Sequence, residues 1–153
     1  MCSSNRFLVA ISGGIGSGKS KLLKIVEGES SLSPKIGVMK CVEYPKNVDF
    51  KVFIDKPLDL LLIKHAMTLK NESPSKMEEK LHEFRRFHIE NVLPNRLLAD
   101  FYIENLENEE RLHKLIASIH LKMENPTKTD EESEDVMIYL ERYRQNHHPS
   151  KIS

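Results

Sequence analysis

The sequence predicts a three-layer α/β protein, in which a small parallel sheet is flanked by helices. Three observations carry this prediction. Short apolar runs alternate along the chain with longer segments of helical periodicity. A glycine-rich octapeptide separates the first apolar run from the first helical segment. The connections between segments are mostly short, as they are in sheets whose parallel strands alternate with helices.

The first strand and the first helix are expected on either side of the octapeptide. Residues 7–11 are a continuous apolar run, which is typical of a buried parallel strand. Residues 20–27 place four aliphatic side chains on a helical period, and Gly28 is an expected stop. The order is therefore strand, glycine loop and helix.

The later segments continue the alternation. Residues 35–42 and 50–55 are predicted to be the second and third strands, and a fourth is expected within residues 97–103. Pro57 suits the first position of a helix through residue 69. Two more helices are expected, over residues 76–92 and 108–123, and Pro94 is expected to break the chain after the first of them.

The octapeptide fits the pattern G-x-x-x-x-G-K-[ST] and holds four of the six glycines of the chain. Its residues are Gly13, Gly14, Ile15, Gly16, Ser17, Gly18, Lys19 and Ser20. Glycine costs backbone entropy on folding, so a cluster of glycines indicates close approach of backbone N–H groups to phosphate oxygens. The motif predicts a P-loop NTPase-like fold that binds ATP. The alternative is a glycine-rich turn that only joins a strand to a helix.

Four residues are candidates for the chemistry. Lys19 is expected to place its ammonium group against the β- and γ-phosphates, and Ser20 to offer its hydroxyl to Mg²⁺. Asp55 ends the third predicted strand, where it either caps the helix that starts at Pro57 or holds Mg²⁺ through water. Glu43 follows the second predicted strand at the carboxyl end of the sheet, so it is either the base that accepts a substrate proton or a solvated loop residue.

Composition limits the partners and the compartment. Lys plus Arg and Asp plus Glu number 23 each, so no basic field favours nucleic acid. No apolar run approaches the roughly 18 residues of a membrane span. The two cysteines, Cys2 and Cys41, give no disulfide framework, and the expected location is cytoplasmic. The sequence leaves open whether the chain forms a homodimer.

The composition changes near residue 124. Residues 1–124 are expected to form a P-loop kinase-like domain. Residues 125–153 are expected to be a polar, acidic tail, in which Val136, Leu140 and Tyr143 can form one stripe of a short helix.

Beyond the octapeptide, the chain resembles the deoxynucleoside kinases, the P-loop family that phosphorylates deoxynucleosides at the 5′-hydroxyl. The glycine loop is similar to the family's E-G-N-I-x-x-G-K-S-type loop, and Val42-Glu43-Tyr44-Pro45 looks like its E-P-V element. Residues 76–82, K-M-E-E-K-L-H, resemble its Y-L-x-x-L-H helix. The likeness covers most of residues 6–123, and it implies a nucleoside substrate, ATP and Mg²⁺.

Departures from the family pattern predict slow turnover. A few residues between Pro45 and Phe50 stand where the family has a helical stretch and a strand, so part of the usual kinase core is missing. The family's arginine-rich lid is replaced by a segment with Lys64 and Lys70, and lysine lacks the planar fork that binds phosphate bidentately.

Two other functions stay open. The octapeptide and residues 99–105, A-D-F-Y-I-E-N, also resemble dephospho-coenzyme A kinases, although the acidic substrate-side motif of those enzymes is missing. The third hypothesis is a nucleotide-binding module that has lost catalysis.

Overall fold

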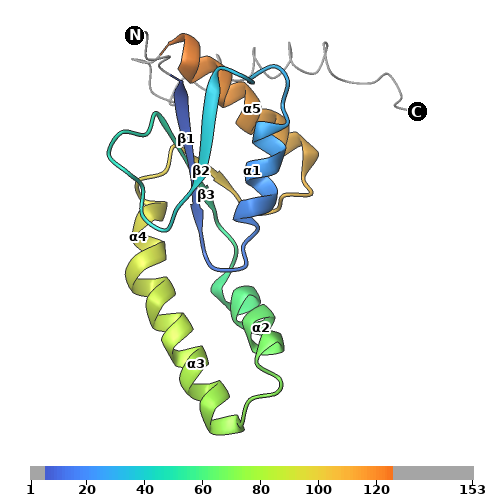
Figure 1. Ribbon diagram of the computed structural model, residues 1–153, viewed down its shortest axis with the longest axis vertical. Helices are drawn as coiled ribbons and strands as arrows, with labels where there is room; N and C mark the ends of the chain where they lie inside the picture. Colours follow the sequence, from blue (N-terminus) through green and yellow to red (C-terminus); the bar gives the residue numbers. More distant parts are fainter. Residues whose placement is uncertain (1–5, 126–153) are drawn as a thin grey trace, which may run out of the picture. The chain divides into compact units, whose positions relative to one another are not determined.

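Four parallel strands form one sheet in the order β2–β1–β3–β4 (Figure 1). The structure is a computed structural model, and it describes residues 6–125. The strands are β1 (Phe7–Gly13), β2 (Ile36–Lys40), β3 (Phe50–Ile54) and β4 (Phe101–Ile103). The predicted α/β class, a small parallel sheet accompanied by helices, is confirmed.

β1 lies in the interior of the sheet, between β2 and β3. Val9, Ala10 and Ile11 are all fully buried. Because successive side chains of a strand point to opposite faces, both faces of β1 are covered. This explains why the strand is a continuous apolar run rather than an alternating one.

The strand register brings the carboxyl ends of three strands to one edge. Ile11 pairs with Lys40 of β2, and Gly13 pairs with Ile54 of β3. The segments that follow β1, β2 and β3 therefore all start at this edge, which is where ligands bind in open parallel sheets.

The connection from β2 to β3, residues 41–49, contains no helix and returns to the opposite edge of the sheet. Tyr44 is buried along it, and its hydroxyl donates to the carbonyl of Val52 at 2.6 Å. At Asp49, the last residue of this connection, two hydrogen bonds join the chain to Leu8 of β1. The backbone N–H of Leu8 donates to Oδ2 of Asp49 at 2.8 Å, and the Asp49 N–H donates to the Leu8 carbonyl at 2.9 Å. Polar contacts to β1 and β3 thus replace the packing of a crossover helix.

Two strands are shorter than predicted. β2 ends at Lys40 rather than at residue 42, because the carbonyl of Val42 accepts hydrogen bonds from the Ser12 hydroxyl, at 2.8 Å, and from Asn95 Nδ2. β4 begins only at Phe101, because residues 97–98 form a turn after α4, in which Leu97 is 86% exposed.

The helix α1 (Lys19–Glu27) follows the glycine loop and packs beside β1 and β2 (Figure 1). Leu22 and Val26 form its buried face. Gly28 ends it, and its N–H donates to the carbonyl of Lys24 at 2.9 Å. The predicted helix over residues 20–27 is confirmed.

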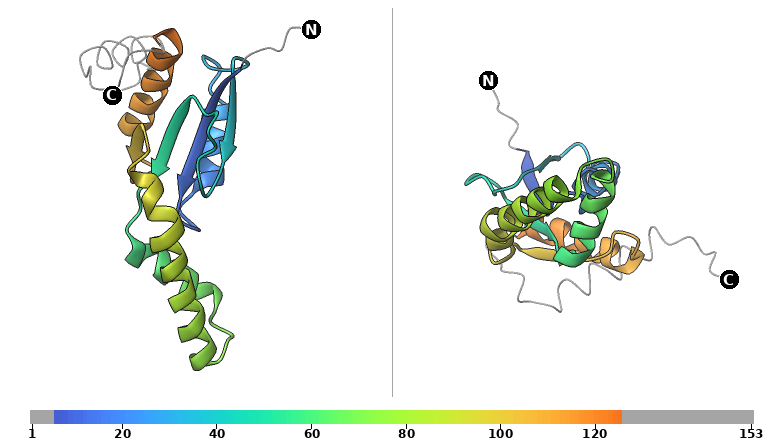
Figure 2. Two further views of the ribbon diagram at one scale, coloured as in Figure 1. Left: turned by 90° about the vertical axis from the view of Figure 1, so that its left-hand side faces the viewer. Right: turned by 90° about the horizontal axis from the view of Figure 1, so that it is seen from below.

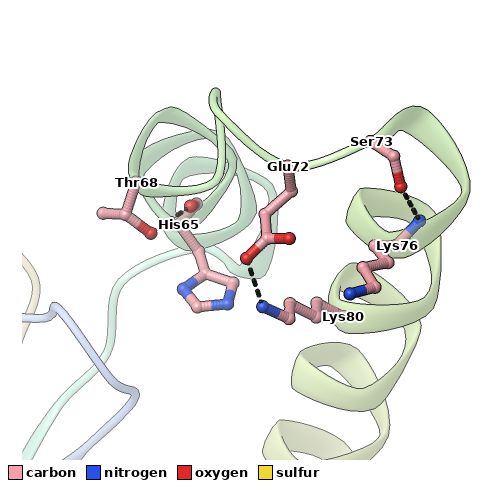
Figure 3. Close-up of polar contacts among 6 residues, drawn as sticks. All are labelled: His65, Thr68, Glu72, Ser73, Lys76 and Lys80. Atoms are coloured by element: carbon pink, nitrogen blue, oxygen red, sulfur yellow. Dashed lines mark hydrogen bonds and ion pairs between the residues drawn. The ribbon is translucent and has the colours of Figure 1, made fainter.

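Two helices, α2 (Leu58–Thr68) and α3 (Pro74–Phe87), lie side by side and extend from the carboxyl edge of the sheet (Figure 2). Polar contacts fix the turn between them (Figure 3). The hydroxyl of Ser73 accepts from the N–H of Lys76 at 3.4 Å. The ammonium of Lys80 contacts Oε1 of Glu72 at 2.6 Å. The Ser73 cap moves the helix start to Pro74, two residues before the predicted position.

The predicted break at Pro94 is wrong. α3 runs into a π-helical turn, η1 (His88–Val92), and then into α4 (Leu93–Arg96), which contains Pro94. Proline in a regular α-helix clashes with the carbonyl four residues earlier and lacks an N–H donor. The wider π turn relaxes that spacing, and Pro94 lies in the first turn of α4, where its N–H is not needed.

The chain divides into two units after Asn105. Among the described residues, the second unit holds α5 (Glu109–Glu124), which agrees with the helix predicted over residues 108–123. Asn108 caps it by accepting from the N–H of Arg111 at 3.0 Å. The predicted domain boundary near residue 124 stays a prediction, and the short helix expected around Val136 lies outside the described residues.

No helix between residues 6 and 125 has both the length and the apolar composition needed to span a bilayer.

We predict that His88 makes stability depend on mildly acidic pH. The side chain is 3% exposed, and burial lowers its pKa below the ordinary value of 6.5, against the opposing effect of Asp55. As pH falls below that value, the unfolded chain takes up a proton that the folded chain resists, so stability is lost. The free energy of unfolding should fall by up to about 1.4 kcal/mol per pH unit below that point.

Urea unfolding of wild type, His88→Gln and His82→Gln over this pH range measures the effect. His82 is exposed on α3, so its variant should keep the wild-type slope. The His88→Gln variant should show a shallower slope. Equal slopes in all three proteins would contradict the prediction.

Candidate functional site

An open cavity of about 490 Å³ lies at the carboxyl edge of the sheet, beside the loop between β1 and α1. Residues of the loop, of α1, of β2 and the segment after it, and of α2 form its walls. The lining residues are Gly16, Gly18, Lys19, Ser20, Lys40, Cys41, Val42 and Lys64.

The glycines of the loop have a conformational and a steric role. Gly16 and Gly18 have φ of 85° and 104°, in the left-handed region that favours glycine. At Gly14, a Cβ would lie 2.5 Å from Cδ1 of Leu61, so any larger residue would displace the side chain behind the loop. The N–H of Ser17 donates to the Gly14 carbonyl at 3.0 Å and closes the turn.

The N-terminus of α1 opens onto this loop. Gly18 is its N-cap residue, and no side chain caps the helix. The first N–H groups of a helix have no acceptor within the helix, and the helix dipole makes this end positive. An anion at the cavity can therefore accept hydrogen bonds from the backbone.

Three lysine ammonium groups from three different elements converge on the octapeptide. Lys19 of α1 donates to the carbonyl of Gly13 at 3.1 Å. Lys64 of α2 donates to the carbonyl of Gly16 at 2.9 Å. Lys40, the last residue of β2, donates to the hydroxyl of Ser20 at 2.9 Å. These elements are adjacent at the lower end of the sheet in Figure 1.

The charges of the cavity are unbalanced. None of its lining residues is acidic. Burial lowers the pKa of Lys19, the neighbouring Lys40 lowers it further, and Cys41 opposes the shift. Burial also raises the pKa of the Cys41 thiol, against the effect of Lys19. A bound anion would relieve the repulsion among the ammonium groups, and a cation would increase it.

Only part of the octapeptide lines the cavity. The four octapeptide residues in the wall are Gly16, Gly18, Lys19 and Ser20. The other four are Gly13, Gly14 and Ser17, which are buried, and Ile15, which is 50% exposed. The predicted cofactor-binding residues are thus brought to one place, although not all of them face the cavity.

Glu43 is exposed and does not line the cavity, but its neighbour Val42 does. The Val42 carbonyl is fixed by Ser12 of β1 and Asn95 of α4, so the backbone before Glu43 is held at the edge of the site. The role of Glu43 as a base stays a prediction.

Asp55 contacts a guanidinium group, whereas the sequence predicts that it either caps the following helix or holds Mg²⁺. Its Oδ2 atom lies 3.0 Å from Nε of Arg96, and Pro57 occupies the N-cap position of α2 without any side-chain cap. The expectation that Asp55 caps this helix is therefore wrong, because the carboxylate is directed to a guanidinium group instead. Asp55 also does not line the cavity.

The lining residues fit a phosphate chain but do not fit Mg²⁺. Mg²⁺ in proteins is held by carboxylates together with phosphate oxygens. Here the oxygen side chain at the cavity is the Ser20 hydroxyl, which already accepts from the Lys40 ammonium. Within residues 6–125, no group of three or more His, Cys, Asp or Glu residues could hold a metal ion.

Two cavity residues, Lys40 and Cys41, were missed from the sequence. The predicted second strand ran to residue 42, which placed both inside a strand rather than at its end. Their position at the end of the strand follows from the strand register, which pairs Ile11 with Lys40, the last residue of β2. Of the two lid candidates, Lys64 reaches the loop, whereas Lys70 is exposed in the turn after α2 and does not line the cavity.

No known family model matches this chain, and no curated protein matches it either. The function is therefore inferred from the cavity and its residues.

Proposed function

We propose that the chain binds a nucleoside triphosphate at this cavity through its phosphates, and transfers the terminal phosphate slowly to the 5′-hydroxyl of a (deoxy)nucleoside. The observation that carries the proposal is the convergence of Lys19, Lys40 and Lys64 on one glycine loop.

The electrostatics favour an anionic ligand of several charges. Three ammonium groups without a lining carboxylate repel one another until an anion neutralises them. The positive end of α1 adds a fixed partial charge on the same side. A triphosphate supplies several negative charges in a row, so it can contact more than one ammonium group at once.

The same parts suit phosphoryl transfer. This reaction needs little covalent participation from the protein, because positioning and stabilisation of charge supply most of the catalysis. Lys19 and the loop N–H groups would stabilise the transferred phosphate, and Glu43 would accept the proton of the acceptor hydroxyl. The nucleoside as acceptor comes from the sequence resemblance alone.

Slow transfer is proposed because two aids to catalysis are missing from the cavity. Its lining contains no arginine, whose planar fork can bind two phosphate oxygens. Glu43 is exposed and lies outside the cavity lining, so its carboxylate is not held in position at the phosphates.

A second candidate is a nucleotide-binding module without turnover. The absence of any carboxylate from the cavity lining favours it, since no base is in place at the phosphates. A panel of nucleosides and dephospho-coenzyme A, assayed with labelled ATP, separates this candidate from the kinases. Phosphorylation of dephospho-coenzyme A alone would identify the other small-molecule kinase.

We predict that Lys19→Ala weakens ATP binding by about tenfold to a hundredfold, since a hydrogen bond to a charged group contributes about 1.5–3 kcal/mol. Lys24→Ala is the matched control, because Lys24 is exposed on the same helix and does not line the cavity. Titration calorimetry on the three proteins measures the dissociation constants. Equal affinity in wild type and Lys19→Ala would refute nucleotide binding at this loop.

We predict that Glu43→Gln lowers any turnover by about a hundredfold without changing ATP affinity, because removal of a general base has an effect of that size. Glu27→Gln, at the exposed end of α1, should leave turnover unchanged. Product formation from labelled ATP is the readout. Unchanged turnover in Glu43→Gln would exclude Glu43 as the base, and no turnover on any acceptor would leave only the binding module.

A further inference from the structure

We infer that this site binds nucleotide phosphates without a divalent cation, and that the ammonium group of Lys40 takes the place of the metal. The inference rests on the proposed function, because it concerns how the same cavity holds the phosphate chain. It concerns a residue that the glycine-loop motif does not include.

The first observation is the partner of Ser20. The motif leads one to expect that this hydroxyl serves a metal ion, but in this protein it accepts a hydrogen bond from Lys40 Nζ at 2.9 Å. The parallel register makes this contact possible. Lys40 is the last residue of β2, at the carboxyl edge beside β1, and Ser20 is in the first turn of α1, which β1 leads into.

The second observation is the charge of the surrounding atoms. A divalent ion on the Ser20 hydroxyl would lie beside the Lys40 ammonium and close to Lys19, whose pKa the charge of Lys40 already lowers. No lining residue offers a carboxylate to offset this repulsion. The cavity therefore opposes a metal ion at the position where the motif would hold one.

The contact with Ser20 also places the Lys40 ammonium where it can supply the positive charge that a metal ion would supply. A metal ion in such a site neutralises phosphate charge and bridges the oxygens to the protein. An ammonium group anchored on Ser20 supplies a positive charge at the same place, with two further N–H donors for phosphate oxygens. Together with Lys19 and Lys64, it surrounds the loop with three cations.

The test compares ATP binding in the presence of excess EDTA and in the presence of Mg²⁺. Titration calorimetry is run on the full chain for wild type, Lys40→Met and Lys35→Met. The methionine keeps an unbranched apolar side chain while it removes the charge. Lys35 is the matched control, because it is an exposed lysine that precedes the opposite end of β2 and does not line the cavity.

Wild type and Lys35→Met are expected to bind ATP in EDTA at least as tightly as in Mg²⁺. Lys40→Met is expected to bind at least about tenfold more weakly in EDTA, as for the loss of one charge-assisted hydrogen bond. Mg²⁺ should then restore part of its affinity, because no ammonium group beside the Ser20 hydroxyl repels the metal ion. Inorganic tripolyphosphate should show the same pattern, since the contacts involve only phosphate.

Two results would overturn the inference and leave the proposed function intact. One is wild-type ATP binding that requires Mg²⁺. The other is metal-free affinity that Lys40→Met does not change. Absence of ATP binding under both conditions, with a folded protein by circular dichroism, would instead reject the proposed function and this inference together.

Discussion

The contact of three ammonium groups with one short loop is the constraint on which the site depends. Like charges repel, so the arrangement requires an oxygen acceptor for each lysine, and the octapeptide supplies them as two carbonyls and the Ser20 hydroxyl. Between these acceptors the chain passes through Gly16 and Gly18, which adopt left-handed conformations that favour glycine. A change in the loop conformation would move the Gly16 carbonyl, to which Lys64 donates.

The parallel sheet is what brings these groups together. Residues from α1, β2 and α2 are far apart in sequence, but the elements start or end at the same edge because β1, β2 and β3 are parallel and in register. The burial of β1 on both faces keeps it in the interior of the sheet, between β2 and β3. The packing of the core thus sets the geometry of the charged surface.

Local patterns predicted the parts of the fold that local physics determines. The apolar run of β1, the glycine loop and α1 follow from residues 7–28 alone. The features that were missed depend on distant partners. β2 ends at Lys40 because the Val42 carbonyl is bound by Ser12 and by Asn95, 30 and 53 residues away. The helix continues through Pro94 because a π turn precedes it, and no short sequence pattern predicts such a turn.

Alkylation of Cys41 tests the central claim, that phosphate binds among these lysines, most directly. Its thiol lines the cavity, and a Cys2→Ser substitution leaves it as the only thiol of the chain. If phosphate binds there, tripolyphosphate and ATP should slow the reaction of Cys41 with iodoacetamide in proportion to occupancy of the site, at constant pH. An unchanged rate at concentrations that saturate binding by calorimetry would place the phosphate elsewhere and contradict the account.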